Sequence, residues 1–221
     1  MSSLLLVRHG QASWGADDYD VLSETGAEQS RILGTALAAR GIVPGVLVHG
    51  AMKRQRETAR LAAEAARWDT AAEQDAGWDE MDHLALLARQ PATFEGEQPT
   101  AREFQVWFEA ATDRWVSGDF DGEYDESFPA FSARVAGALE RLTARLGQGA
   151  TALVVTSGGP IARTCASLLG SGVALHSLLA PVVVNASITK LVVGRRGTTL
   201  VSFNAHGHLE KADRPELITY R

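Results

Sequence analysis

The stretch Leu4-Leu5-Leu6-Val7-Arg8-His9-Gly10 changes from apolar to polar within one residue. A short apolar run of this kind is typical of a buried strand, whose polar residues leave at its C-terminal end. In open α/β sheets, ligands bind at that end of the strands. We expect Gly10 to let the backbone turn sharply and approach a ligand closely.

Two side chains in this stretch can carry chemistry. Arg8 offers a planar fork of donors that suits a phosphate or a carboxylate. His9, if it is held neutral, is a nucleophile or a base. An Arg-His-Gly sequence can also end a strand by chance, so only the rest of the chain can distinguish a functional site from a coincidence.

The composition describes an ordinary globular protein. The chain has 221 residues, of which 45% are apolar and 22% charged, and its formal net charge is −6. This negative charge argues against a protein that binds nucleic acids or membranes in general. The single cysteine, Cys165, excludes an internal disulfide and a cysteine-based metal cluster. With no signal-like or bilayer-length apolar run, we expect a cytoplasmic protein.

A loop and a helix follow the first strand. In residues 11–22 we expect Gln11 and Ser13 to donate hydrogen bonds toward the ligand of Arg8 and His9, although solvated loop polarity is the simpler alternative. A helix then begins at Ser23 or Thr25, since Thr25-x-x-Glu28 has capping-box spacing, and ends before Gly41.

A second strand and helix repeat this order. Val46-Leu47-Val48 predicts a parallel strand, and residues 52–67 predict a helix with Lys53, Arg54 and Arg56 in its first turns. Cations at a helix N-terminus are unfavourable unless an anion lies nearby, whereas the N-terminus itself favours anions. This placement points to a function for at least one of the three, with Arg54 just beyond the strand end.

The middle of the chain changes character. Residues 71–83 predict a short edge strand that leads into a polar loop, and residues 84–130 are rich in acids and proline around an aromatic-striped helix at 101–116. We expect one domain over residues 1–221, in which residues 84–130 form a helical lid insertion.

The last third contains the clearest buried strand. A helix over 128–146 precedes the strand 152–156, which stops at Ser157-Gly158-Gly159-Pro160, and a helix over 161–169 follows. A strand, a glycine-rich turn and a helix N-terminus form a second anion site, which includes Ser157 and Gly158. Residues 187–193 and 198–203 predict a hairpin at the sheet edge.

Alternating strands and helices predict a three-layer α/β/α sandwich with a mostly parallel sheet. Strand ends then bring Arg8, His9, Arg54 and the glycine-rich turn to one edge. Two arginines around a histidine suit phosphoryl transfer through a phosphohistidine. The leaving oxygen needs an acid, for which Asp79, Glu80 and Asp82 are the candidates. Since the arginines neutralise the phosphoryl charge, we expect no metal and no cofactor.

These elements resemble the histidine phosphatase superfamily, which includes the cofactor-dependent phosphoglycerate mutases. Val7-Arg8-His9-Gly10 matches the family's first strand end, and residues 22–29 match its Leu-(Ser/Thr)-x-x-Gly-x-x-Gln element. Arg54 precedes Thr58-Ala59 as the family's second arginine precedes its Thr-Ala pair, and Glu80 matches a Glu in a short polar loop. The resemblance extends to the C-terminal hairpin and implies a phosphoglycerate mutase-like fold.

The resemblance also implies roles. His9 is expected to be the phosphorylated nucleophile, with one ring nitrogen oriented by a backbone carbonyl. Arg8 and Arg54 are expected to bind the phosphoryl oxygens, and Glu80 to act as general acid and then as base. Gln11 and Ser13 lie in the loop that often touches the substrate in this family.

Two positions depart from the family pattern. Ser157 stands where the family has a second histidine, and Gly50 stands where it usually has a serine. A serine donates one hydrogen bond but carries no charge, and losing a donor from such a site costs on the order of 10²–10³ in rate. His49, His83 or His206 could replace the missing imidazole, although each is more simply a surface or packing histidine.

The sequence therefore favours a phosphomonoesterase that acts through a phosphohistidine on a small phosphorylated metabolite. The alternative is a weak or silent protein that binds a phosphorylated ligand or regulates through it. A phosphoglycerate-type mutase is disfavoured by the short insertion and by Ser157. The edge hairpin or the helix at 101–116 is compatible with a homodimer.

Overall fold

The computed structural model describes residues 1–13, 20–96 and 98–220. The chain forms two compact units, of which the first comprises Met1–Glu80 and Val135–Arg221 and the second Met81–Arg134. The predicted site residues all lie in the first unit, which is described first. Asp82, one of the alternative acids, lies in the second.

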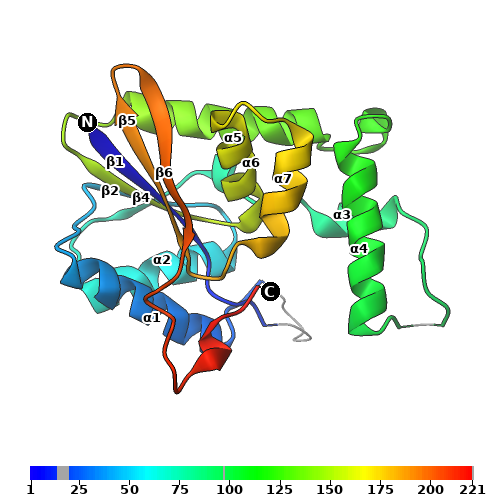
Figure 1. The fold of residues 1–221 in the computed structure, drawn as a ribbon, viewed down its shortest axis with the longest axis horizontal. Coiled ribbons are helices and arrows are strands. Elements are labelled where there is room, and N and C mark those ends of the chain that lie inside the picture. Colours follow the sequence, from blue (N-terminus) through cyan, green and yellow to red (C-terminus); the bar gives the residue numbers. More distant parts are fainter. Residues whose placement is uncertain (14–19, 97, 221) are drawn as a thin grey trace. The chain divides into compact units, whose positions relative to one another are not determined.

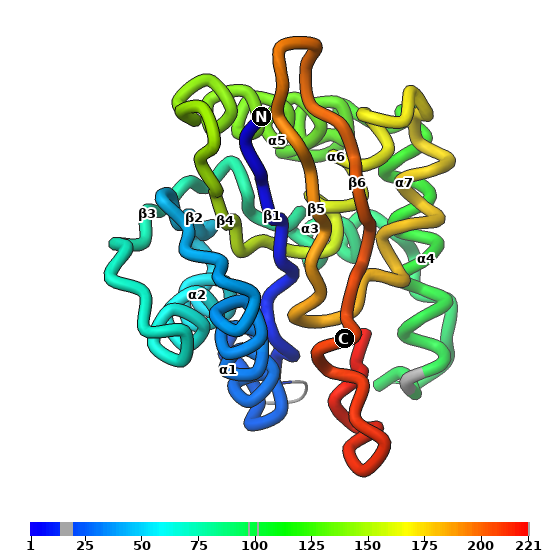
Figure 2. The backbone as a smooth tube through the Cα atoms, turned by 60° about the vertical axis from the view of Figure 1, so that its left-hand side comes forward, coloured from blue at the N-terminus to red at the C-terminus, as the bar shows by residue number. Residues whose placement is uncertain are grey.

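The described residues of the first unit form one six-stranded sheet in the order β3-β2-β4-β1-β5-β6 (Figures 1 and 2). Four strands run parallel, and the β5–β6 hairpin runs antiparallel at one edge. This arrangement confirms the predicted mostly parallel α/β sheet with its edge hairpin. The strands are β1 (Ser2–Arg8), β2 (Val46–His49), β3 (Ala72–Gln74), β4 (Thr151–Thr156), β5 (Ile188–Gly194) and β6 (Gly197–Ala205).

Helices cover both faces of this sheet. Helices α1 and α2 lie on one face, and α6, α7 and the last part of α5 lie on the other (Figure 1). The three layers agree with the predicted sandwich. The helices are α1 (Glu24–Ala39), α2 (Lys53–Ala66), α5 (Phe128–Ala144), α6 (Gly158–Leu168) and α7 (Val173–Leu179). Short 3₁₀ turns lie at η1 (Ala76–Trp78), η3 (Ala180–Val182) and η4 (Pro215–Leu217).

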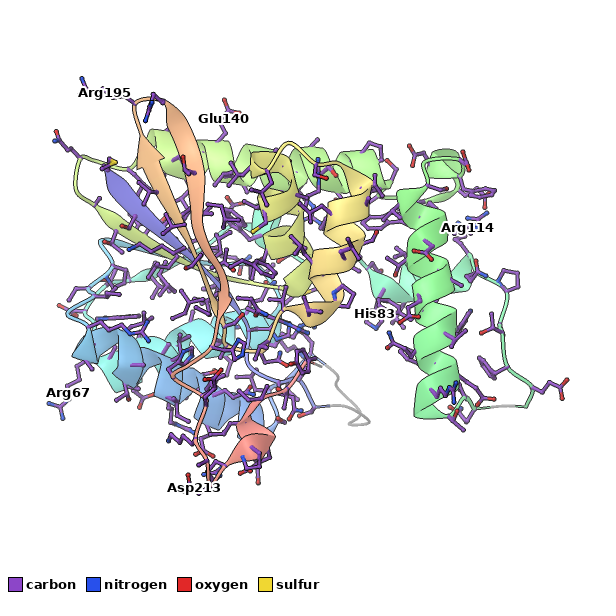
Figure 3. The ribbon with its side chains drawn as sticks, in the orientation of Figure 1. Arg67, His83, Arg114, Glu140, Arg195 and Asp213 are labelled. Carbon is purple, nitrogen blue, oxygen red and sulfur yellow. The ribbon has the colours of Figure 1, made fainter. Side chains whose placement is uncertain are left out.

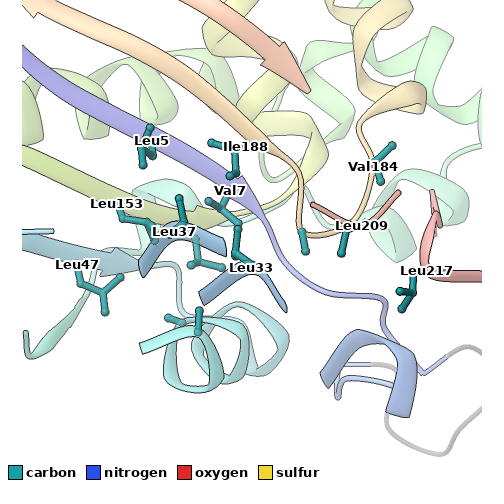
Figure 4. Packing of buried hydrophobic residues seen from close by; sticks show 14 residues of the cluster. Leu5, Val7, Leu33, Leu37, Leu47, Leu153, Val184, Ile188, Leu209 and Leu217 are labelled. Atoms are coloured by element: carbon teal, nitrogen blue, oxygen red, sulfur yellow. The ribbon is translucent and has the colours of Figure 1, made fainter. Parts of the chain in front are cut away.

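The alternation of side chains along the strands explains the layers. Leu5 and Val7 of β1 belong to one buried cluster with Leu33 and Leu37 of α1 (Figure 4). Leu4 and Leu6 are equally buried but point to the other face, because successive side chains of a strand alternate. A strand buried on both faces needs an unbroken apolar run, which is why the first residues of this chain decide its fold.

The structure selects one of the two predicted starts for α1 and corrects the predicted start of α6. Ser23, with extended backbone, is the N-cap of α1, and its hydroxyl accepts a hydrogen bond from the Gly26 N–H over 3.0 Å. The capping box at Thr25 is therefore wrong, and Glu28 instead pairs with Arg214 at 2.8 Å. Helix α6 begins at Gly158 rather than at residue 161. Proline is tolerated there because the first-turn N–H groups have no intrahelical partner.

The second unit consists of α3 (His83–Ala88), α4 (Ala101–Val116), the turn η2 (Asp121–Glu123) and the start of α5. Trp115 of α4 is fully buried against Phe128 and Phe131, with ring centroids 5.1 and 5.3 Å apart. Arg114 extends from the same helix (Figure 3) and pairs with Glu123 at 2.8 Å. The expected role of residues 84–130 as a lid stays a prediction. Across the described part of the chain, no helix combines the length and apolar character needed to cross a membrane.

Candidate active site

The C-terminal ends of three parallel strands meet at one edge of the sheet. Arg8 of β1 is in register with Thr156 of β4, and His49 of β2 is in register with Val155. His9, Gly50 and Ser157 therefore leave the sheet side by side. Parallel pairing alone produces this convergence, although the three residues are far apart in the sequence.

Hydrogen bonds to three other segments hold the backbone at His9 and Gly10. The His9 N–H donates to Thr156 O over 2.8 Å, and its carbonyl accepts from Asn185 Nδ2 over 3.0 Å. The next N–H, of Gly10, donates to the Thr58 hydroxyl over 3.0 Å. A Cβ at Gly10 would lie 2.3 Å from Gly26 O, so glycine is required here by the close packing against α1. The expected approach of this backbone to a ligand stays a prediction.

The hydrogen bonds of the His9 ring determine its tautomer. Arg54 Nε lies 3.1 Å from His9 Nε2, and a guanidinium can only donate, so Nε2 accepts and carries no proton. The proton of the neutral ring then resides on Nδ1, which donates to Gly10 O over 2.7 Å. A lone pair on Nε2 is what a nucleophilic histidine requires.

The surroundings of His9 keep this ring neutral. The residue is 5% exposed. Burial, followed by the positive charges of Arg54 and Arg8, lowers its pKa well below 6.5 and outweighs the opposite effect of the Gly10 carbonyl. At neutral pH the uncharged imidazole is therefore the dominant form of His9.

Arg54 has a partner that the sequence reasoning missed. Its Nη1 forms an ion pair with Asp20 Oδ1 at 2.8 Å, and Asp20 Oδ2 accepts from the Lys53 N–H over 2.8 Å. The carboxylate thus supplies the anion that the cations at the α2 N-terminus require. Asp20 belongs to an acidic loop, and only the fold shows which of its carboxylates reaches Arg54. The neighbouring loop residues Trp14 and Gly15 lie outside the described residues.

Arg8 and Gly158 are brought together. The Arg8 Nη1 donates to the Val183 carbonyl. A Cβ at Gly158 would lie 3.9 Å from the Arg8 Cζ, so the guanidinium packs over the first residue of α6. A cation and the N-terminus of α6 thus lie next to each other, and both favour an anion.

Glu80 lies at the same helix N-terminus. Its Oε2 accepts from the Gly159 N–H over 2.9 Å. A Cβ at Gly159 would lie 2.0 Å from Glu80 Oε1, so only glycine leaves room for the carboxylate. Glu80 is half-buried, whereas Asp79 Oδ1 accepts from the Ala51 N–H over 2.6 Å, at the start of the segment that leads into α2.

Ser157 and Gln55 form a buried polar pair. Both residues are fully buried, and Gln55 Nε2 donates to the Ser157 hydroxyl over 2.9 Å and to Trp78 O over 3.2 Å. The sequence reasoning did not single out Gln55, because one polar residue in a basic helix carries no signal of its own. Its position opposite Ser157 and Gly50 is visible only in the fold.

Gln11 and Ser13 are held near the start of α1. Gln11 Oε1 accepts from the Ser23 hydroxyl over 2.8 Å, and the Gln11 N–H donates to Gln29 Oε1 over 2.8 Å. The Ser13 N–H donates to Val21 O over 2.9 Å. Their expected contacts with a substrate stay predictions.

Other histidines have backbone partners. His49 Nδ1 lies 2.6 Å from Gly50 O, and His206 Nδ1 lies 2.6 Å from Asn204 O. His83 belongs to the second unit. In the described ranges, no group of three or more His, Cys, Asp or Glu side chains could hold a metal ion.

Comparison with known proteins agrees with this arrangement. The family model described as "Histidine phosphatase superfamily (branch 1)" matches residues 4–206. Two curated relatives are 2,3-bisphosphoglycerate-dependent phosphoglycerate mutases, from Erythrobacter litoralis (38% identical over 72 residues) and Thermobifida fusca (41% over 73 residues). Each match covers 30% of this chain, and 32% and 29% of the respective relatives. The chain thus aligns with about a third of their length.

Similar solved structures share the fold. YhfR of Bacillus stearothermophilus has a TM-score of 0.73 at 20% identity, covering 95% of this chain and 100% of that one. A phosphoserine phosphatase mutant of Entamoeba histolytica, in complex with phosphoserine, has a TM-score of 0.69 at 20% identity, with the same coverage. A phosphoglycerate mutase of Bacillus anthracis has a TM-score of 0.64 at 20% identity, covering 94% of each chain. With a family model that matches nearly the whole chain, this protein belongs to the histidine phosphatase superfamily, branch 1.

Proposed function

We propose that this protein is a phosphomonoesterase that hydrolyses a small phosphorylated metabolite through a phosphohistidine at His9, without a metal or cofactor. The observation that carries this proposal is the His9 ring: Nδ1 donates to Gly10 O, and Nε2 faces Arg54 with its lone pair. A neutral imidazole in this tautomer is prepared to attack an electrophile from Nε2.

In the first step, His9 Nε2 attacks the phosphorus atom in line with the leaving oxygen. Arg54 transfers its hydrogen bond from Nε2 to a phosphoryl oxygen, and Arg8 and the N-terminus of α6, with Ser157 and Gly158, hold the others. The P–O bond breaks as the P–N bond forms, and Glu80 donates a proton to the leaving alcohol.

In the second step, water replaces the released alcohol. Glu80, now ionised, takes a proton from this water as its oxygen attacks phosphorus. The P–N bond breaks, and the products are inorganic phosphate and His9 in its starting tautomer. Glu80 regains its proton, so the cycle balances without another reactant.

The substrate class follows from the charges of the site. Arg8 and Arg54 would supply two positive charges for a phosphoryl group, and Gln11 and Ser13 would contact the rest of a small molecule. Solved relatives in complex with phosphoserine or 3-phosphoglyceric acid support a compact phosphorylated metabolite.

The test is the release of phosphate from para-nitrophenyl phosphate with a chelator present, in the native protein and in His9→Ala. We expect turnover in the native protein and its loss in the variant. Equal rates in the two proteins would refute the role of His9.

A second function, a phosphorylated-ligand binder without turnover, is favoured by one observation. Ser157 is fully buried and bonded to the neutral Gln55, so the site lacks a cationic side chain at this position. Tight binding of inorganic phosphate by calorimetry, together with no turnover between pH 5 and 9, would select this function.

A further inference from the structure

We propose that Gln55 is a positioning residue that holds the Glu80 carboxylate in a fixed position relative to Arg54. This inference rests on the proposed function, in which Glu80 is the general acid and base. The Gln55 amide joins three segments that carry site residues. It lies next to Arg54 on α2, and its Nε2 reaches both Trp78 O and the Ser157 hydroxyl.

Both partners of Gln55 lead directly to Glu80. Trp78 precedes Glu80 by two residues, and its carbonyl also accepts from the Thr156 hydroxyl over 2.5 Å. Ser157 precedes Gly158 and Gly159, and the Gly159 N–H binds Glu80 Oε2 over 2.9 Å. Gln55 thus holds the backbone two residues before Glu80 and also the Ser157 side chain, two residues before the Gly159 N–H that binds the Glu80 carboxylate.

The space for Gln55 comes from a missing side chain. A Cβ at Gly50 would lie 2.0 Å from Gln55 Oε1 and 2.4 Å from Asp79 Oδ1. Gly50 and Gln55 are therefore matched, because a larger residue at position 50 would displace the amide. Ser157, with its small side chain, meets the other end of the same amide.

The cost of burying Gln55 argues for a function. Its Oε1 is buried and has no hydrogen-bond partner among the residues that the structure describes. An unsatisfied buried acceptor is unfavourable, and an apolar side chain of the same shape would avoid this penalty. The orphaned oxygen is explained if the other end of the amide, Nε2, serves to hold the segments of the site.

The test compares the native protein with Gln55→Met, which keeps the length of the side chain and removes the polar atoms Oε1 and Nε2. We expect a kcat lower on the order of 10- to 100-fold, with a smaller change in KM. The midpoint of thermal unfolding should change little, because the loss of the bond to Ser157 is offset by removal of the unpaired Oε1, and Trp78 O keeps the Thr156 hydroxyl. A residue that only supports the fold would show the reverse, a lower midpoint and an unchanged kcat for the folded protein. Gln74→Met, at an exposed position of β3, is the matched control.

A double-mutant cycle identifies the route of the effect. If Gln55 acts through Glu80, Gln55→Met will cause little further loss of kcat in the Glu80→Gln background. Fully additive losses would overturn the proposal, because they would mean that Gln55 acts on another group.

A second readout does not depend on turnover. The NMR resonance of the Gly159 amide proton reports its hydrogen bond to the Glu80 carboxylate, so we expect it to move upfield in Gln55→Met. An unchanged Gly159 resonance would overturn the proposal even in an active enzyme. If His9→Ala and the native protein were equally inactive, the proposed function would fail, and the Gly159 resonance would still decide the role of Gln55.

Discussion

Asp20 and Arg54 form an ion pair, with Asp20 Oδ1 lying 2.8 Å from Nη1 of the arginine that also contacts His9. The carboxylate holds Arg54 in the orientation that its Nε needs to reach His9. It also neutralises part of the positive charge that a phosphoryl group would meet. Asp20 therefore favours order in the site at the expense of anion affinity.

We predict that Asp20→Asn binds inorganic phosphate several-fold more tightly while its kcat falls. The amide retains an acceptor for the Lys53 N–H, but the negative charge that competes with phosphate is gone. Calorimetric titration with phosphate and steady-state kinetics separate the two effects. Weaker phosphate binding by Asp20→Asn would contradict this account of the ion pair.

Gly159→Ala is expected to reduce turnover without destabilising the protein. The new Cβ would meet Glu80 Oε1 at 2.0 Å, and a flexible carboxylate moves more easily than a helix. Alanine is no worse than glycine in the first turn of a helix, so α6 should be about as stable as in the native protein. Thermal unfolding and kcat are the two measurements.

Gly207→Ala, where a Cβ meets open space, is the control for this substitution. We expect its kcat to equal that of the native protein. If Gly159→Ala had native kcat, the carboxylate at the α6 N-terminus would have no part in turnover.

The protein should lose stability as the pH falls below 6.5. Burial lowers the pKa of His208 from 6.5 to about 4, assisted by the charges of Arg40 and His206 and opposed by the Ala186 carbonyl. At pH 5 the unfolded chain binds a proton at this residue and the folded protein does not. The free energy of unfolding is therefore lower by about 2 kcal/mol at pH 5 because of this residue. His176, with a pKa also lowered to about 4 by burial and by Arg163, contributes with the same sign.

Urea unfolding at pH 7.5 and pH 5 measures this loss. His208→Gln keeps a donor for the Ala186 carbonyl but does not titrate, so its stability should change less between the two pH values. An identical pH dependence in the variant and the native protein would show that His208 is not the source.

The sequence was sufficient for the parts of the site that follow from strand ends. Polar groups lie at one edge of the sheet because parallel strands end together. They follow the apolar run before Arg8 and the strand before Ser157, and they begin α2. Glu80 was one of three candidate acids, and its bond to the Gly159 N–H became visible only when the loop met α6.

The missing parts depend on contacts between distant segments. Asp20 is one carboxylate of an acidic loop, and nothing in its neighbours indicates that it reaches Arg54. Gln55 is informative only together with Gly50 and Ser157, since its amide occupies the space beside Gly50 and donates to the Ser157 hydroxyl. The predicted start of α6 lies three residues too late, because Gly158, Gly159 and Pro160 are poor formers of a helix interior but are acceptable in a first turn.

The most direct test of the central claim is to trap the phosphoryl group on His9. Glu80→Gln cannot activate water, whereas the nitrophenolate of para-nitrophenyl phosphate leaves without needing a proton from Glu80, so a phosphoenzyme formed from this substrate should accumulate in the variant. Glu140→Gln, on the exposed part of α5 (Figure 3), is the matched control. Peptide mass spectrometry at alkaline pH is expected to find the phosphoryl group on His9 in Glu80→Gln. A phosphoryl group on another residue, or undiminished turnover in His9→Ala, would contradict the account.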